Sequence, residues 1–123
     1  MNVLLALLLA IQITSITWHD GPPTLPKGTK VAVLEGDTKQ PGLFTMRLNV
    51  PAGSKIAPHT HPRAERVTVL SGKVTVHLDG KDTTFTAGGF YVTPPNEPHS
   101  VTFDEESVIQ LTCEGPWELR YVE

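Results

Sequence analysis

The chain has 123 residues, a length that suits one domain with a single modest hydrophobic core. The formal net charge is −3 and 19% of the residues are charged, which excludes the basic surface that nucleic-acid binding needs, so we expect no nucleic-acid partner. The single cysteine excludes an intrachain disulfide and a cysteine-rich zinc site.

Residues 1–17 predict a cleaved secretory signal peptide. They carry no charged side chain, and residues 3–13 form an almost unbroken apolar run that is shorter than the roughly twenty residues of a membrane-spanning helix. Cleavage would leave residues 18–123 as a single domain with no stable membrane insertion. We therefore expect an exported protein, periplasmic or extracellular if bacterial. A buried N-terminal strand or an uncleaved anchor is the alternative.

The rest of the chain predicts an all-β fold. Eleven prolines and ten glycines interrupt it too often for long helices, and short β-rich runs recur between turn residues. The pair Asp79-Gly80, between two alternating runs, predicts a type I′ hairpin, which needs positive φ at both central residues. In chain order, the expected strands cover residues 31–34, 43–50, 66–70, 73–78, 83–86, 90–93, 99–103, 108–113 and 117–122.

The segment that follows residue 58 places polar side chains on a face that should be apolar. If it is mostly extended, His59, His61 and Glu65 share one face with Val67 and Val69. Polar groups that point inward cost free energy unless something compensates for them, and a metal ion would do so. Two neutral imidazoles and one carboxylate suit Fe, Mn, Ni, Zn or Cu.

A third histidine begins a later predicted strand. His99 follows the proline-rich turn 94–98, which would hold it in a rigid position. Each candidate also has a purely structural interpretation: the histidine pair as satisfied polar residues in a turn, Glu65 as the surface partner of Arg63 or Arg66, and His99 as a capping residue.

Around these residues the chain resembles the cupin superfamily. The first cupin motif is Gly, five residues, His-x-His, three or four residues, Glu, six residues, Gly, and its spacing is met by Gly53, His59, His61, Glu65 and Gly72. The second motif is Gly, five residues, Pro-x-Gly, two residues, His, three residues, Asn, and it corresponds to Gly88, Pro94, Asn96, His99 and Phe103. Asn96 in place of glycine can still adopt a left-handed conformation, whereas Phe103 in place of asparagine predicts a more apolar pocket wall.

The resemblance implies a double-stranded β-helix, the cupin jelly-roll barrel, with a metal at its mouth. It implies His59, His61, Glu65 and His99 as ligands of one divalent transition metal (Fe, Mn, Ni, Zn or Cu, with Fe or Mn preferred). Small cupins often dimerise through N-terminal strands, so a homodimer is expected, with residues 30–34 as the candidate strand.

The expected function is a metal-dependent oxidoreductase of dioxygenase type that acts on a small organic molecule. An ion with three histidine ligands and one glutamate ligand keeps about two open positions for substrate or O2. Glu65 is the candidate catalytic base as well as a ligand. The alternative function is a non-enzymatic barrel that binds a metal and a small ligand; a barrel without any chemistry would hold no metal.

Other residues are expected to be structural. His77 alternates with Lys73 and Thr75 and should face solvent, whereas Cys113 alternates with Ile109 and Leu111 and should lie in the core. No base is assigned to this cysteine, so we do not expect it to act as a nucleophile.

Overall fold

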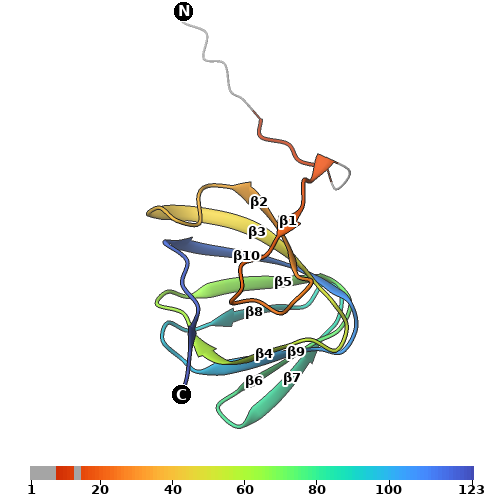
Figure 1. Cartoon of the computed structure of the whole chain (residues 1–123), viewed down its shortest axis with the longest axis vertical. Coiled ribbons are helices and arrows are strands. Elements are labelled where there is room, and N and C mark those ends of the chain that lie inside the picture. Colours follow the sequence, from red (N-terminus) through yellow and green to blue (C-terminus); the bar gives the residue numbers. More distant parts are fainter. Residues whose placement is uncertain (1–7, 13–14) are drawn as a thin grey trace, which may run out of the picture.

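The computed structural model describes residues 8–12 and 15–123, which form two antiparallel sheets (Figure 1). The strands are β1 (His19–Asp20), β2 (Lys30–Glu35), β3 (Gly42–Val50), β4 (Lys55–Thr60), β5 (Glu65–Ser71), β6 (Val74–Leu78), β7 (Lys81–Phe85), β8 (Phe90–Thr93), β9 (His99–Phe103), β10 (Ser107–Gly115) and β11 (Arg120–Tyr121). One sheet has the order β1-β2-β3-β10-β5-β8 and the other β11-β4-β9-β6-β7. This architecture confirms the predicted all-β, double-stranded β-helix fold.

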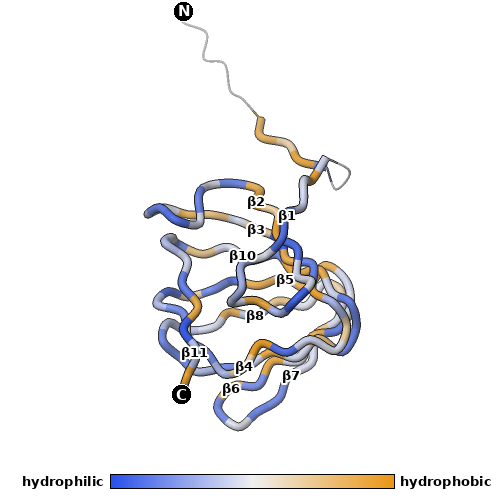
Figure 2. Tube along the Cα trace, in the orientation of Figure 1, coloured by the Kyte–Doolittle hydropathy of each residue, from blue (hydrophilic) through white to orange (hydrophobic). Residues whose placement is uncertain are grey.

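The hydrophobic core lies between the two sheets. In β3 the inward positions are Phe44, Met46, Leu48 and Val50, each at most 2% exposed, and they alternate with more exposed residues. Figure 2 shows the same alternation as hydrophobic and hydrophilic stretches along the strands. Phe103 belongs to this core and is 1% exposed. Burying a large apolar side chain contributes about 1.5–3 kcal/mol, so this face of the strands fixes their register.

Two strand predictions change in the structure. Residues 55–60 form β4 and pair with β9, although only residues 59 and 60 fell within a segment expected to be extended. Of the predicted strand at residues 117–122, only Arg120–Tyr121 pairs, because the preceding residues turn toward the histidines instead of joining the sheet. The predicted hairpin is confirmed: Asp79 has φ 51° and Gly80 has φ 72°, between β6 and β7.

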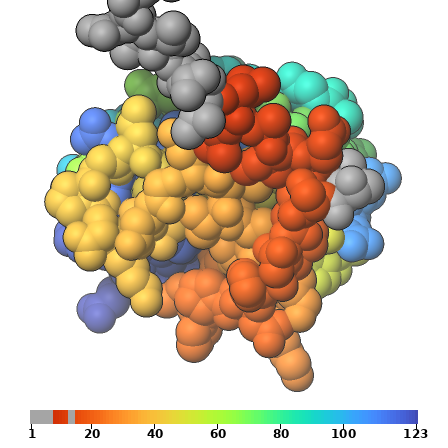
Figure 3. All heavy atoms as spheres, turned by 90° about the horizontal axis from the view of Figure 1, so that it is seen from above, coloured from red at the N-terminus to blue at the C-terminus, as the bar shows by residue number. Residues whose placement is uncertain are grey.

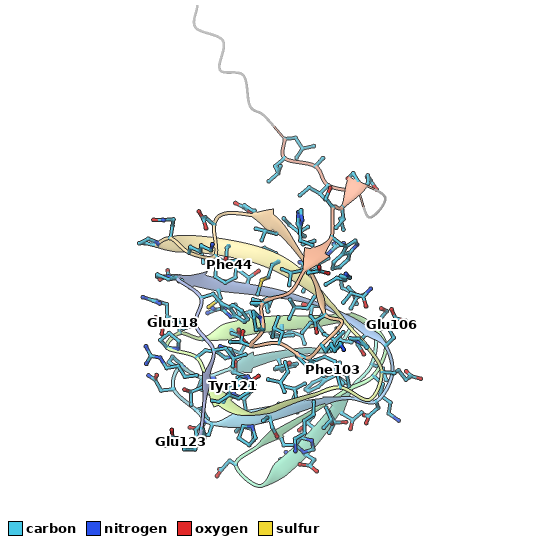
Figure 4. All side chains as sticks on the ribbon, viewed as in Figure 1. Phe44, Phe103, Glu106, Glu118, Tyr121 and Glu123 are labelled. Atoms are coloured by element: carbon cyan, nitrogen blue, oxygen red, sulfur yellow. The ribbon has the colours of Figure 1, made fainter. Side chains whose placement is uncertain are left out.

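The end of the first cupin motif is a tight turn between β5 and β6. Gly72 has φ 90°, and a Cβ atom there would lie 2.2 Å from Ser107 Oγ and 2.4 Å from the Glu106 carbonyl oxygen. Glycine is therefore required by backbone geometry at this position. Glu106 lies at the side of the barrel opposite Glu118, so this turn is remote from the C-terminal segment (Figure 4).

The predicted signal peptide, residues 1–17, lies partly outside the described residues. Residues 8–12 are exposed and form no strand. Residues 15–35 cover one face of the molecule next to β3 (Figure 3), where β1 pairs with β2 and Lys30 forms an ion pair with Asp20. Within residues 8–12 and 15–123, no helix combines the length and the apolar character that crossing a membrane would take.

Candidate metal centre

Three buried histidines meet inside the barrel. His59 lies on β4 and His99 begins β9, and their Cα atoms are direct partners across these neighbouring strands. His61 follows β4 immediately. The rings of His59 and His99 are 4.2 Å apart, and those of His59 and His61 are 4.8 Å apart. One nitrogen of each histidine lies within 4.8 Å of the others, so the structure brings the distant His99 to the predicted pair.

Backbone carbonyl groups fix the tautomer of all three rings. The Nδ1–H groups of His59, His61 and His99 donate to the carbonyl oxygens of Ala57, Glu118 and Glu97 at 2.7, 2.7 and 3.0 Å. A carbonyl oxygen only accepts, so Nδ1 carries the proton and Nε2 of each neutral ring keeps its lone pair. A hydrogen bond from the non-ligating nitrogen is the usual support of a metal-binding histidine.

Burial keeps these imidazoles neutral. The pKa of His59 is lowered to about 4, mainly by burial and to a smaller extent by the neighbouring His99 and His61, while the hydrogen bond to the Ala57 carbonyl opposes the shift. Burial also lowers the pKa values of His61 and His99 below the ordinary histidine value. Three acceptor nitrogens then face one another in a buried space, an arrangement that costs free energy unless a cation lies between them. The donor set therefore fits a divalent transition metal.

Glu65 lies beside the three histidines but is not in the set that shares the 4.8 Å spacing. Its Oε1 atom is 3.2 Å from His61 Nε2, and its Oε2 atom accepts a 2.7 Å hydrogen bond from Trp117 Nε1. Burial raises the pKa of this carboxyl group, and the indole hydrogen bond opposes that rise. Glu65 is only 5% exposed, so it is not the surface partner of a neighbouring arginine.

The proline-rich turn orients two of the histidines. Asn96 has φ 60°, which confirms the predicted left-handed conformation in place of glycine. Its backbone N–H donates to the carbonyl oxygen of His61 at 2.7 Å. Glu97 in the same turn accepts the Nδ1–H of His99. The turn thus connects the two cupin motifs at the site.

The C-terminal segment supplies two residues that the sequence did not identify. The Trp117 ring stacks on His61 with 5.9 Å between centroids and 22° between planes. Glu118 contributes its backbone carbonyl to His61. Figure 4 shows the segment running from Glu118 past Tyr121 to Glu123 along one side of the barrel. A tryptophan after Gly-Pro is the only signal in the sequence, and nothing in it relates position 117 to position 61.

A cavity of about 190 Å³ lies between β6, β7 and β8, and two of its lining residues pair with residues of the site. Leu78 at its wall is the Cα partner of His99, and Thr93 is the Cα partner of Glu65. The hydroxyl oxygen of Thr93 is buried and has no hydrogen-bond partner in the structure. The lining is mostly apolar and consists of Val76, Leu78, Lys81, Thr83, Phe85, Tyr91, Val92 and Thr93.

Two other predictions are confirmed away from the site. His77 is half-buried, with its side chain 32% exposed, and pairs with Asp82 at the surface. Cys113 is 3% exposed in the core, and burial raises the pKa of its thiol to about 11, which disfavours the nucleophilic thiolate.

The structure is a jelly roll in which three inward-facing histidines could hold one metal ion. The family model described as the cupin domain matches residues 46–113, more than half of the chain, so the chain belongs to the cupin family. This confirms the resemblance that the two sequence motifs indicated. Among curated proteins, none matches this chain.

Several solved structures share the fold. The polyketide cyclase RemF from Streptomyces resistomycificus is 18% identical, with a TM-score of 0.77 over 95% of this chain and 87% of that chain. A candidate acetylacetone dioxygenase from Methylibium petroleiphilum PM1 is 21% identical, with a TM-score of 0.74 over 100% of this chain and 86% of that chain. A mutant salicylate 1,2-dioxygenase from Pseudoaminobacter salicylatoxidans is 18% identical, with a TM-score of 0.67 over 80% of this chain and 32% of that chain. At these identities the likeness shows the fold alone.

Proposed function

We propose that this chain is a metal-dependent oxidoreductase of dioxygenase type that acts on a small organic molecule. The observation that carries the proposal is the set of three buried histidines, His59, His61 and His99: each keeps an Nε2 lone pair, and one ligand nitrogen of each lies within 4.8 Å of the others. A redox-active divalent metal bound there, with Fe or Mn preferred, would supply Lewis acidity and electron transfer for oxidation by O2.

The cavity between β6, β7 and β8 supports a small substrate. Its volume of about 190 Å³ exceeds that of an apolar cavity of about 150 Å³ that binds benzene, and it lies below the range of about 300–1,000 Å³ typical of drug-sized ligands. Phe85 and Tyr91, with ring centroids 4.9 Å apart, would contact an apolar or ring portion of the substrate. The unpartnered hydroxyl of Thr93 would bind one polar group. Two similar structures, a candidate acetylacetone dioxygenase and a salicylate 1,2-dioxygenase, are named for substrates of the same size class.

We propose Glu65 as both the fourth ligand and the proton acceptor. Glu65 is the Cα partner of Thr93 on the neighbouring strand, and Thr93 lines the proposed substrate cavity. Burial raises its pKa above the ordinary glutamate value, which makes its carboxylate a stronger base. The proton of a substrate hydroxyl or activated C–H group would move to Oε1 when this oxygen is not bound to the metal, because Oε2 already accepts the indole N–H of Trp117.

Export and dimerisation are further proposals. The exposed apolar residues Leu8 and Leu9 lie outside the core, which suits a removable leader. β1 covers the outer edge of β2 only at Lys30 and Val31, and Val33, two residues further along β2, is 48% exposed. A second copy could pair along this edge. The N-terminal mass of the exported product and the solution mass of the purified protein test the two proposals separately.

Oxygen consumption tests the enzymatic proposal. Tag-free protein loaded with Fe(II) is mixed with β-diketones, hydroxybenzoates and related small molecules in an oxygen-electrode cell. We expect substrate-dependent O2 uptake by the wild-type chain and none by His61→Ala. A protein that binds Fe(II) and a small molecule, but consumes no O2 with any of them, would instead be the non-enzymatic binding barrel.

A further inference from the structure

The indole N–H of Trp117, in the C-terminal segment, donates a hydrogen bond to the carboxylate of Glu65. We infer that Trp117 is a positioning residue that holds Glu65 as a single-oxygen ligand of the metal. The inference rests on the proposed metal site and deepens it, because it assigns different tasks to the two carboxylate oxygens.

The distances around Glu65 distinguish its two oxygens. Oε1 is 3.2 Å from His61 Nε2. Two neighbouring ligands, each bonded to one ion at about 2.1 Å, lie about 3 Å apart when their bonds are perpendicular. Oε1 thus has the spacing of a ligand next to His61. Oε2 accepts the 2.7 Å hydrogen bond from Trp117 Nε1, so it is engaged away from that position.

This division of tasks affects how many positions on the metal stay open. A free carboxylate can bind an ion through one oxygen or both, and binding through both occupies two coordination positions. A hydrogen bond from a neutral donor to an ionised oxygen is short and strong, so the indole N–H favours binding through Oε1 alone. Compared with binding through both oxygens, this leaves one more coordination position open for substrate or water.

The indole is held on several sides. Its ring stacks on His61, and the Trp117 backbone N–H donates to the Thr38 carbonyl oxygen at 2.7 Å. The segment enters at Gly115, where a Cβ atom would lie 2.0 Å from the Gln40 carbonyl oxygen. Arg63, which lies between His61 and Glu65 in the sequence, donates to the Pro116 carbonyl oxygen at 3.2 Å. These contacts leave the N–H little freedom to point elsewhere.

Metal affinity measured with Trp117→Phe tests the inference. Phenylalanine keeps an aromatic ring against His61 but removes the donor to Glu65. Loss of a residue that orients a ligand typically weakens metal binding about 10–100-fold. We expect this loss in calorimetric titrations with Co(II), together with a changed visible spectrum of the bound Co(II). Trp18→Phe, at the chain's other tryptophan, is the matched control and should bind Co(II) like the wild type.

A double-mutant cycle separates positioning from general packing. If Trp117 acts through Glu65, Trp117→Phe should cause no further loss of Co(II) affinity in a Glu65→Gln background. Independent losses that add in the double mutant would overturn the inference, and so would wild-type affinity in Trp117→Phe. A wild-type chain that binds no Co(II) would overturn the metal site itself, which is a different result.

A second measurement does not depend on the folding of Trp117→Phe. In Trp18→Phe, the indole N–H of Trp117 gives the single tryptophan side-chain signal in a ¹⁵N–¹H spectrum. We expect this proton to exchange slowly with solvent, to shift when Zn(II) binds, and to shift and exchange faster in Glu65→Gln. An indole N–H signal that changes neither on addition of Zn(II) nor in Glu65→Gln would contradict the inference.

Discussion

The Nδ1–H group of His61 donates a 2.7 Å hydrogen bond to the backbone carbonyl of Glu118, 57 positions further along the chain. This bond joins a ligand of the first cupin motif to the last segment of the chain. The carbonyl fixes the imidazole tautomer, and the adjacent Trp117 holds the carboxylate beside the same ring. The C-terminal segment therefore belongs to the site, although it lies outside both motifs.

Removal of residues 117–123 should weaken Co(II) binding by more than Trp117→Phe alone. The deletion removes the indole donor and also the carbonyl that orients His61, and each such support is worth about 10–100-fold in affinity. Glu118→Ala is the control, because it keeps the backbone carbonyl, and its affinity should stay close to that of the wild type. Equal affinity of the truncated and complete chains would show that the segment has no part in the site.

Chelation should lower the melting temperature of the metal-loaded protein. A ligand that binds only the native state at 100 times its Kd stabilises that state by about 2.7 kcal/mol. Differential scanning calorimetry with and without a strong chelator measures the effect. His99→Ala should show little response, because it lacks one of the three nitrogens. A wild-type chain that melts at the same temperature in both conditions would be a barrel without a bound metal.

The metal-free protein should lose stability as the pH falls from about 6.5 toward 4. The folded-state pKa of His59 is about 4, below the ordinary histidine value of 6.5, so the unfolded chain takes up a proton first as the pH falls. His61 and His99 shift in the same direction. The raised pKa of Glu65 acts in the opposite direction, since the folded form gains this proton first, so it offsets part of the loss.

Urea unfolding in the presence of a chelator, at pH values from 4.5 to 7, measures this dependence. Each histidine contributes at most about 1.4 kcal/mol per pH unit within the window. The glutamine of His59→Gln does not titrate in this range, so the free energy of unfolding of this variant should fall less steeply with decreasing pH. Stability that stays constant between pH 4.5 and 6.5 would mean that the histidines are not held neutral by burial.

Thr93→Val should stabilise the ligand-free protein and weaken substrate binding. The threonine hydroxyl is buried without a partner, and a methyl group of similar shape avoids a desolvation penalty of about 1–3 kcal/mol. The melting temperature should rise, while KM for an active substrate should increase because the cavity loses a polar contact. Thr83→Val, at the exposed rim of the same cavity, is the control. A lower melting temperature with unchanged KM would argue against a ligand-binding role for Thr93.

The histidine pair could be predicted from the sequence because strand alternation is a local rule. His59, His61 and Glu65 share a parity with buried valines, and the structure buries all three. His99 was identified through motif spacing, since no local pattern relates it to β4. The left-handed conformation at Asn96 could be predicted because asparagine can adopt positive φ, and the structure shows φ 60°.

The contribution of the C-terminal segment could not be predicted in the same way. Alternating residues at positions 117–122 indicate a strand, but the structure pairs only Arg120 and Tyr121 with β4. Trp117 and Glu118 instead contact His61 and Glu65, and such contacts depend on how two distant segments pack. Phe103 likewise lies in the hydrophobic core, although its motif position predicted a pocket wall.

Metal content is the most direct test of the central claim that His59, His61 and His99 hold one ion. Protein purified without a histidine tag is equilibrated with Fe(II) or Mn(II), freed of excess metal and analysed by elemental mass spectrometry. We predict about one metal per chain in the wild type and in His77→Ala, whose histidine lies at the surface, and almost none in His61→Ala. Metal-free wild-type protein, or equal metal content in His61→Ala and the wild type, would contradict the account.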